Sequence, residues 1–373
     1  MIYLDYNATA PIDPAVRQAM LPFLSELHGN ASSSHALGRA AGRAVDAARE
    51  QVASLIGAFP DEIVFTSGGS ESNNHVIKGV ADTLRGRGDH IITSAVEHPA
   101  IRMPCAYLEK RGFRVTRVPV DGTGMVNPDD VKKAVQPSTV LISVMHANNE
   151  VGTIQPIAEI SRIAREASVW MHTDAAQSIG KMPVIVGDLG VEFLSLAGHK
   201  FYAPAGIGAL FIRRGIQIEP LILGAGHEAG RRAGTSAVVN IVGLGAAAHL
   251  VQVDPRSAEM RQRCHQLQRL LEVGLGDRVR VNSRAEKRLP NTLNASFVGE
   301  NSIELLSRMP ELCASPGAAC RHDAMEPSAV LTAMGVPRDL ALGAIRFSLG
   351  RPTTDDEIKA AAEMIIRAVT VRH

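Results

Sequence analysis

The chain has 373 residues, which is long enough for two domains with substantial cores. Hydrophobic residues make up 45% of it and charged residues 21%, which is typical of a soluble globular protein and excludes a disordered one. Its 39 basic and 38 acidic residues nearly balance and only 4% are aromatic, so we expect no nucleic-acid partner and no membrane surface, but a small-molecule ligand.

The first residues lack a basic region followed by an apolar run, and no stretch approaches the length of a membrane span, so we expect a cytoplasmic protein. The four cysteines include no CxxC pair. They are too few for a disulfide framework and lack zinc-ligand spacing, so each is expected to be free and no metal site is expected.

In chain order, the pattern predicts helices over 14–24 and 36–56, separated by a polar loop over 29–35 that contains Asn30. Between residues 63 and 173, short apolar runs alternate with stretches of helical periodicity. We expect strands over 63–65, 91–93, 115–118, 140–145 and 169–172, and helices over 71–86, 99–111 and 157–168. This alternation predicts a mostly parallel mixed sheet that helices cover on both faces.

Further strands are predicted over 193–196 and 207–212, and a helix over 238–251. Near Asp254 the alternation stops. The rest predicts an α+β arrangement with helices over 258–275, 302–308 and 355–371 and strands over 279–282, 292–297, 312–315 and 344–349. We therefore expect a large α/β domain over 14–254 and a smaller α+β domain formed by 1–13 and 255–373.

Polar residues follow several of the predicted strands. Residues 66–74 read TSGGSESNN and open a helix, so the amides near Gly69 and the hydroxyl of Ser70 could bind a phosphate. This stretch is neither a P-loop nor a GxGxxG fingerprint, and a glycine turn with an N-cap serine is the alternative.

His98 follows another strand, where it could stack on a planar ligand, shuttle a proton or be an ordinary loop histidine. Asn149, Asp174 and Gln177 follow two more strands, although Asp174 could simply cap a helix. Lys200 ends the strand that begins at residue 193, where desolvation would lower the pKa of its amine, whereas a solvated loop lysine is the alternative. Together these groups predict a ligand crevice at one edge of the sheet.

Pyridoxal 5′-phosphate needs a lysine that binds it as an imine, an acid for its ring nitrogen, an anion cup for its phosphate and a plane for its ring. The strand ends provide all four. We therefore expect pyridoxal 5′-phosphate as the cofactor.

Seven short segments, in order along nearly the whole chain, resemble the cysteine desulfurases of the class V aminotransferase group. They are 4–9 (LDYNAT), 66–74 (TSGGSESNN), 96–98 (VEH), 146–152 (HANNEVG), 172–178 (HTDAAQS), 198–200 (GHK) and 346–351 (RFSLGR). The resemblance implies the fold-type I architecture of pyridoxal-phosphate-dependent transferases, and removal of sulfur from L-cysteine to give L-alanine.

The resemblance also implies roles for individual residues. Lys200 would bond the cofactor and Asp174 its ring nitrogen, His98 would stack on the ring, and Asn149 and Gln177 would contact its substituents. The phosphate would be bound by Gly69, Ser70 and His199, and by Thr235 from a partner subunit, so a homodimer with shared sites is expected. Asn30 and Arg346 would bind the substrate carboxylate.

The segment 315–328 (SPGAACRHDAMEPS) is expected to be a polar loop, and in the resembled family the matching segment is a mobile arm that carries the nucleophile. Cys320 would thus take the sulfur as a persulfide, with Arg321 and His322 favouring its thiolate. A protein acceptor, such as an iron–sulfur scaffold, would then receive the sulfur.

Two positions depart from the family. Ala197 replaces a common phosphate-binding serine, and Ala229 replaces the arginine of a Glu–Arg–Gly element. An apolar residue at position 197 also fits the selenocysteine lyases, so selenocysteine lyase or another carbon–sulfur lyase is the alternative. A non-catalytic sulfur-relay protein that retains the fold is an alternative of another class.

Overall fold

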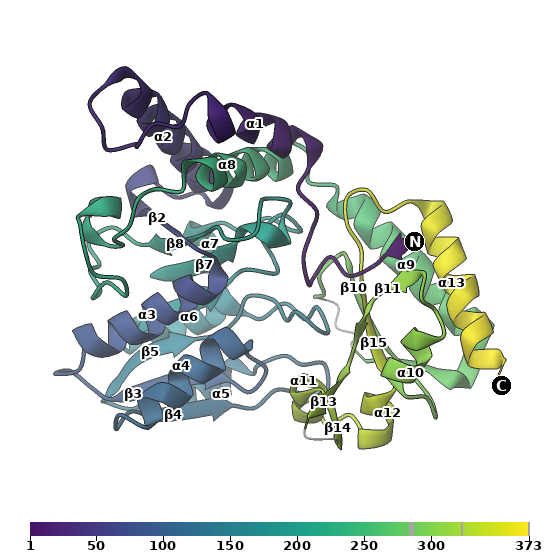
Figure 1. Cartoon of the computed structure of the whole chain (residues 1–373). Coiled ribbons are helices and arrows are strands. Elements are labelled where there is room, and N and C mark those ends of the chain that lie inside the picture. The colour runs from purple at the N-terminus through teal and green to yellow at the C-terminus, as the bar shows by residue number, and fades with distance from the viewer. Residues whose placement is uncertain (283–286, 322–323, 372–373) are drawn as a thin grey trace.

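Most elements of the chain gather around a seven-stranded and a four-stranded sheet, as the computed structural model in Figure 1 shows, and two further pairs of short strands accompany them. The structure describes residues 1–282, 287–321 and 324–371, and for residues 318–321 and 324–325 it describes only the backbone. Among these residues, no single helix is both long enough and apolar enough to cross a bilayer.

The larger sheet has seven strands, of which the five that run from β7 to β4 are parallel, whereas β8 runs antiparallel to both its neighbours. The predicted mostly parallel mixed sheet is therefore confirmed. In spatial order its strands are β2 (Ile63–Thr66), β8 (Gly208–Ile212), β7 (Phe193–Ala197), β6 (Trp170–Asp174), β5 (Thr139–Ser143), β3 (His90–Ser94) and β4 (Arg114–Val118).

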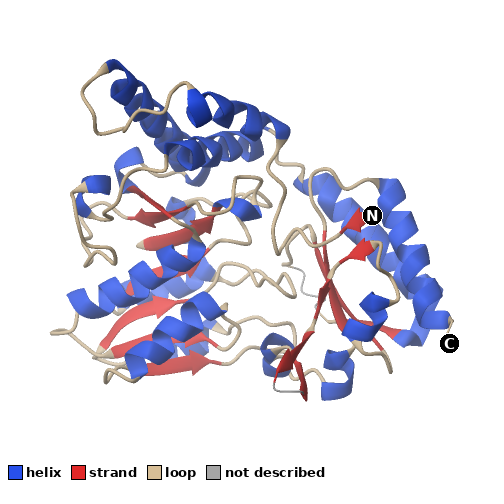
Figure 2. Cartoon of the chain, in the orientation of Figure 1, coloured by secondary structure: helices blue, strands red, loops and turns tan. Residues whose placement is uncertain are grey.

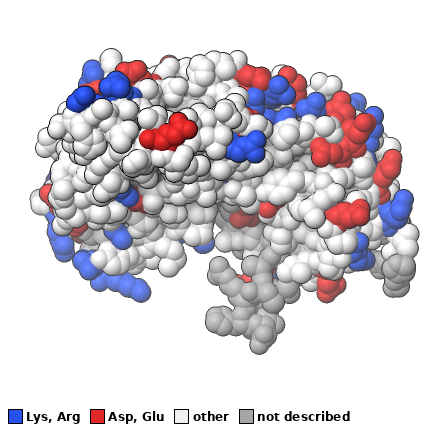
Figure 3. All heavy atoms as spheres, turned by 45° about the horizontal axis from the view of Figure 1, so that its top comes forward, with Lys and Arg blue, Asp and Glu red and all other residues white. Residues whose placement is uncertain are grey.

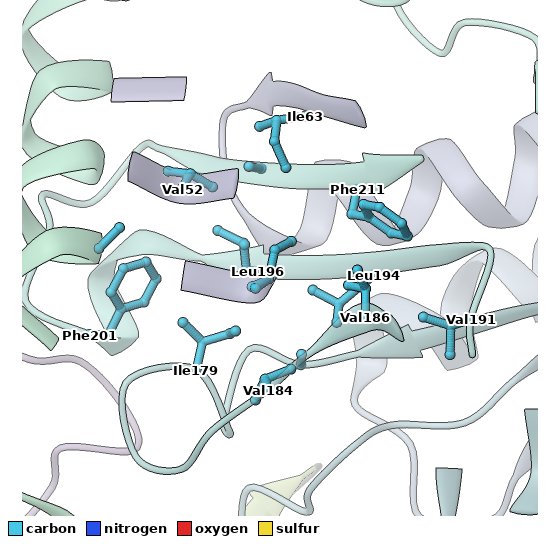
Figure 4. Packing of buried hydrophobic residues seen from close by; sticks show 14 of the residues in the cluster. Val52, Ile63, Ile179, Val184, Val186, Val191, Leu194, Leu196, Phe201 and Phe211 are labelled. Atoms are coloured by element: carbon cyan, nitrogen blue, oxygen red, sulfur yellow. The ribbon is translucent and has the colours of Figure 1, made fainter. Parts of the chain in front are cut away.

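Helices cover both faces of this sheet because its strands are apolar on both sides. Along β7, Leu194 and Leu196 join one hydrophobic cluster, part of which Figure 4 shows, while Phe193 joins the cluster on the opposite face. The first cluster includes residues of α1 (Pro14–Ser25), α2 (Ala36–Ile56), α5 (Pro128–Ala134), α6 (Ile157–Glu166), α7 (Val186–Leu189) and α8 (Val238–Val253). The opposite cluster includes α3 (Gly69–Thr83) and α4 (Pro99–Glu109).

The second sheet is antiparallel, with the order β12 (Ser315–Pro316), β15 (Ala344–Ser348), β10 (Thr292–Phe297) and β9 (Val279–Val281). It shares a core with α9 (Ser257–Leu275), α10 (Ser302–Ser307) and α13 (Asp355–Thr370). Leu4 joins this core, and β1 (Ile2–Tyr3) pairs with β11 (Leu312–Cys313). The beginning of the chain thus packs with its end, and the segment after β1 leads back to the larger sheet (Figure 1).

Short elements complete the chain, as Figure 2 shows. They are the helices α11 (Ala329–Ala333) and α12 (Arg338–Leu342) and the 3₁₀ turns η1 (Pro60–Glu62), η2 (Gly198–Lys200), η3 (His227–Gly230) and η4 (Gly276–Arg278). Charges of both signs are interspersed over the face in Figure 3, and no patch of one sign dominates it.

The structure corrects the prediction for the segment around Cys320. The expected loop contains a hairpin, in which β13 (Ala318–Arg321) pairs with β14 (Ala324–Pro327) and Cys320 lies opposite Met325. The expected strand over 312–315 is two short strands that pair in different sheets, β11 with β1 and β12 with β15. These pairings join residues that are distant in sequence or lie across a turn, so local composition did not reveal them.

Candidate active site

A cavity of about 530 Å³ lies where β3, β5, β6 and β7 of the larger sheet end. The structure brings most of the expected site residues to its wall. They are Gly69, Ser70, His98, Asn149, Asp174, Gln177, His199, Lys200 and Arg346. The carboxyl ends of parallel strands meet at one edge of a sheet, which explains why residues far apart in sequence converge here.

Two expected site residues, Asn30 and Thr235, lie outside the lining of this cavity among the residues that the structure describes. Asn30 is exposed in the loop before α2, where its side chain accepts a hydrogen bond from the amide of Ser32 (2.9 Å). The structure therefore does not bring Asn30 to Arg346, contrary to expectation. Thr235 is exposed and also lies outside the lining, and Cys320 is placed on β13 only by its backbone.

The anion cup is the N-terminus of α3. Gly68 precedes this helix with a φ of 149°, which glycine tolerates, and it has no side chain to cap the first amides. These amides, from Gly69 to Glu71, line the cavity and remain available to an anion. Ala197 also lines the cup, and a Cβ on Gly69 would lie 3.3 Å from its Cβ.

Lys200 ends η2, directly after β7. Its Nζ donates to the main-chain carbonyls of Asn7 (2.7 Å) and Ala8 (2.6 Å). Burial and the positive charge of Arg346 lower the pKa of its amine to about 8, although Asp174 opposes the shift. A substantial fraction of Lys200 is therefore a neutral nucleophile near neutral pH.

Asp174, at the end of β6, is buried and held by two donors. Its Oδ2 accepts from Asn73 Nδ2 (2.7 Å) and its Oδ1 from the amide of Ala176 (3.0 Å). These bonds fix the orientation of the carboxylate against the cavity. Asp174 is thus suited to receive a protonated ring nitrogen.

Two histidines of the wall are kept neutral. Burial and the nearby charge of Lys200 lower the pKa of His199 to about 4. Partial burial, Lys200 and Arg102 also lower the pKa of His98, against the opposing effect of Asp174. The Nδ1 of His98 accepts from the amide of Ala100 (3.1 Å), so the proton of its neutral ring lies on Nε2.

Arg346, on β15, brings the second sheet to the cavity. Its guanidinium donates to Asp5 Oδ1 (2.7 Å), Ser315 Oγ (2.7 Å) and the carbonyl of Asn149 (3.0 Å). Its buried Nε has no partner among the described residues. A cationic fork at the edge of the cavity can bind a carboxylate.

Four residues that hold the site together were not predicted from the sequence: Asp5, Asn7, Asn73 and Lys181. Asp5, Asn7 and Asn73 lie within segments that carry the resemblance, and this position in the sequence could have identified them as site residues. Lys181 gave none, because it resembles a surface lysine after a glycine turn.

These residues fit pyridoxal 5′-phosphate. The uncapped amides of α3 suit a phosphate, and the low pKa of the Lys200 amine suits imine formation. Asp174, with both oxygens anchored, suits the pyridine nitrogen.

The model of the family described as Aminotransferase class-V matches residues 2–361. "Cysteine desulfurase IscS" from Dictyoglomus turgidum is 48% identical over 372 residues, which cover 99% of this chain and 94% of that protein. Among solved structures, "NIFS-LIKE PROTEIN" superposes with a TM-score of 0.92 at 37% identity and covers 99% of both chains. "SspA in complex with cysteine" reaches a TM-score of 0.84 at 39% identity and covers 94% of this chain and 99% of its own. The chain therefore belongs to the class-V aminotransferase family, within its group of cysteine desulfurases.

Proposed function

We propose that this protein is a pyridoxal-phosphate-dependent cysteine desulfurase. It converts L-cysteine to L-alanine and leaves the sulfur as a persulfide on Cys320. The observation that carries the proposal is the convergence of Lys200, Asp174 and the uncapped N-terminus of α3 on one cavity. The titles of the relatives, cysteine desulfurase and a complex with cysteine, support the substrate.

The cofactor would be held by the chain's own groups. Gly69, Ser70 and His199 would bind its phosphate, together with Thr235 of a partner subunit. Asp174 would hold the ring nitrogen, His98 would lie against the ring, and Asn149 and Gln177 would contact its substituents. When bound, the cofactor supplies a protonated ring that accepts the electron pair released at the substrate α-carbon.

Arg346 binds the substrate carboxylate and thereby orients the α-carbon toward Lys200. The Lys200 amine, with its pKa of about 8, then removes the α-proton as a general base. His98 carries a proton on Nε2 in the same cavity and can return one to the product.

Cys320 completes the reaction as a thiolate that attacks the substrate sulfur. The carbon–sulfur bond breaks, a sulfur–sulfur bond forms, and the substrate carbon gains a proton as it becomes the methyl group of alanine. The overall reaction, L-cysteine plus Cys320 thiol to L-alanine plus Cys320 persulfide, needs no external oxidant. A protein acceptor such as an iron–sulfur scaffold then removes the outer sulfur.

We place the protein in the cytoplasm as a homodimer with shared sites. Cys105, Cys264 and Cys313 are free, as in a reducing compartment, which supports this location. The exposed position of Thr235, outside its own chain's cavity, fits a residue that serves a partner subunit.

Selenocysteine lyase is the second candidate, because an apolar residue such as Ala197 at this position also fits the selenocysteine lyases. Alanine release from L-cysteine and from L-selenocysteine, measured with the same holoenzyme and with Lys200→Ala as the blank, decides between them. We expect turnover of L-cysteine that Lys200→Ala abolishes. Turnover of selenocysteine alone would overturn the proposal in favour of the second candidate.

A further inference from the structure

Lys181 is a second lysine at the site, behind the wall of the cavity. Its side chain is only 5% exposed, and its Nζ donates to Gln177 Oε1 (2.7 Å) and Asn7 Oδ1 (2.8 Å). Gly180 allows the chain to turn inward just before it, since its φ is 76° and a Cβ there would lie 2.7 Å from the Cβ of Phe201. The fold therefore places a buried amine between two amide side chains.

The number of hydrogen-bond partners fits an uncharged amine. Burial, Lys200 and Arg346 lower the pKa of Lys181 well below its usual range. A neutral amine has two N–H groups, and the amide oxygens of Gln177 and Asn7 accept both. Lys181 can thus act as a fixed pair of donors without placing a third positive charge beside Lys200 and Arg346.

These bonds determine which group Gln177 presents to the cavity. Its Oε1 is occupied by Lys181, and its Nε2 donates to the main-chain carbonyl of Asn7 (3.0 Å). A flipped amide would set its oxygen against that carbonyl oxygen, so the observed orientation is the only one that both neighbours favour. The second N–H on Nε2 remains for a ligand in the cavity that Gln177 lines.

Lys181 also holds Asn7, the residue that receives Lys200. Asn7 is 1% exposed, and its main-chain carbonyl accepts from both Lys200 Nζ (2.7 Å) and Gln177 Nε2 (3.0 Å). Its Nδ2 donates to the carbonyl of Asn149 (3.2 Å). Through Asn7 and Gln177, one buried amine is connected to Lys200 and to both residues assigned to the ring substituents.

We propose that Lys181 is a positioning residue that orients Gln177 so that an N–H donor, rather than the amide oxygen, meets an acceptor oxygen of the bound cofactor. Its second bond goes to Asn7 Oδ1, which also accepts from Asn291 Nδ2 (3.1 Å), so the position of Asn7 does not depend on Lys181 alone. This inference rests on the proposed function in one respect, that pyridoxal 5′-phosphate is the ligand of the cavity.

The test uses holoenzymes of Lys181→Met, which keeps an unbranched side chain one atom shorter but removes the donors, and Lys181→Gln, which keeps a neutral donor. Lys78→Met is the control, because Lys78 lies on α3 over the ring of Tyr107, away from Gln177. The measurements are the ratio of the absorption bands of the bound cofactor at one pH and the dissociation constant of the cofactor. Thermal unfolding of each variant checks folding.

We expect Lys181→Met to change the band ratio in the direction of Gln177→Leu and to weaken cofactor binding roughly tenfold. Lys181→Gln should lie closer to the wild type, and Lys78→Met should match it. In the Gln177→Leu background, Lys181→Met should change the band ratio no further, because its effect on the ring passes through Gln177.

A wild-type band ratio in Lys181→Met, or an effect of the same size with and without Gln177, would overturn the inference. A role in filling space alone predicts that Met serves better than Gln, which the band ratio also reveals. If Lys181→Met does not fold, Lys181→Leu, which also lacks a donor, provides the same comparison in the two backgrounds. The spectra require only that the cofactor binds. The effect of Lys181 on the band ratio can therefore be interpreted even if the protein proves not to be a desulfurase.

Discussion

The Nζ of Lys200 donates a 2.7 Å hydrogen bond to the main-chain carbonyl of Asn7. The lysine follows strand β7 of the larger sheet, whereas Asn7 belongs to the segment after β1, which pairs with β11. The N-terminal segment and the larger sheet therefore meet at the Lys200 amine, to which we assign catalysis. A neighbouring bond, from Arg346 of β15 to Asp5 (2.7 Å), ties the same segment to another part of the cavity wall.

The first prediction concerns the titration of Lys200. Because burial and Arg346 lower the pKa of its amine from 10.5 to about 8, the reactive neutral form increases as the pH rises through about 8. The rate at which apoprotein gains the visible band with added pyridoxal 5′-phosphate should rise with pH, with a midpoint near that value. Replacing Arg346 with Gln should move the midpoint upward, since a nearby positive charge is lost. A midpoint close to that of free lysine would contradict the assignment.

The second prediction restores a hydroxyl in the anion cup. Ala197→Ser should tighten cofactor binding by about 1 to 2 kcal/mol, roughly five- to thirtyfold, because a phosphate oxygen gains a donor. Ala205→Ser is the control, since Ala205 lines the same cavity. Equilibrium titration of the apoproteins measures both. Equal affinities for Ala197→Ser and the wild type would show that position 197 does not reach the phosphate.

The third prediction concerns Arg346. Lys keeps the charge at this position but loses the planar fork that binds a carboxylate through two bonds. We expect Arg346→Lys to raise the KM for L-cysteine by about ten- to a hundredfold and to change kcat less. Steady-state alanine release checks this split. A fall in kcat at constant KM would instead place Arg346 in the chemical step.

The fourth prediction concerns Glu97, which follows β3 and is 3% exposed. Its Oε1 accepts from Ser94 Oγ (2.5 Å) and the amide of Met145 (2.9 Å), and burial raises the pKa of its carboxyl from 4.5 to about 8. The folded protein therefore holds a proton that the unfolded chain releases above pH 4.5. Stability due to this group is full below that pH and is lost as the pH rises toward 8.

Glu97→Gln removes this titration, so its melting temperature relative to the wild type should increase from pH 5 to pH 8. Glu50→Gln, an exposed change on α2, is the control and should run parallel to the wild type. Thermal unfolding across this pH range measures both variants. Parallel curves for Glu97→Gln would mean that Glu97 is already ionised in the folded protein.

Most of the larger sheet could be predicted from sequence, because buried parallel strands are short apolar runs that alternate with amphipathic helices. The helix α5 was missed, although Asn127 and Pro128 are an N-cap and a first-turn proline. The hairpin around Cys320 was missed for a different reason. Its strands are rich in small and polar residues, and only their pairing with each other identifies them.

The candidate site likewise contains residues that the sequence predicts and residues that it does not. Asp174 and Lys200 were predictable, since each directly follows a strand and such ends converge. Asn7 and Lys181 were not, because their roles depend on contacts across the fold, between residues 7 and 200 and between residues 7 and 181. Asn30 shows the opposite case, in which a residue that the resemblance assigns to the site lies outside the cavity of its own chain.

Mapping the sulfur after a single turnover shows whether the protein desulfurates L-cysteine and whether Cys320 accepts the sulfur. Holoenzyme is mixed with L-cysteine, alanine is quantified, and thiol-alkylated peptides are analysed by mass spectrometry. We predict one alanine for each added sulfur, with that sulfur on Cys320, and the same result in Cys313→Ala, which removes the free cysteine of β11. Cys320→Ala should keep the visible band of the cofactor and form no persulfide. A persulfide on another cysteine in that variant, or no alanine from L-cysteine in the wild type, would contradict the account.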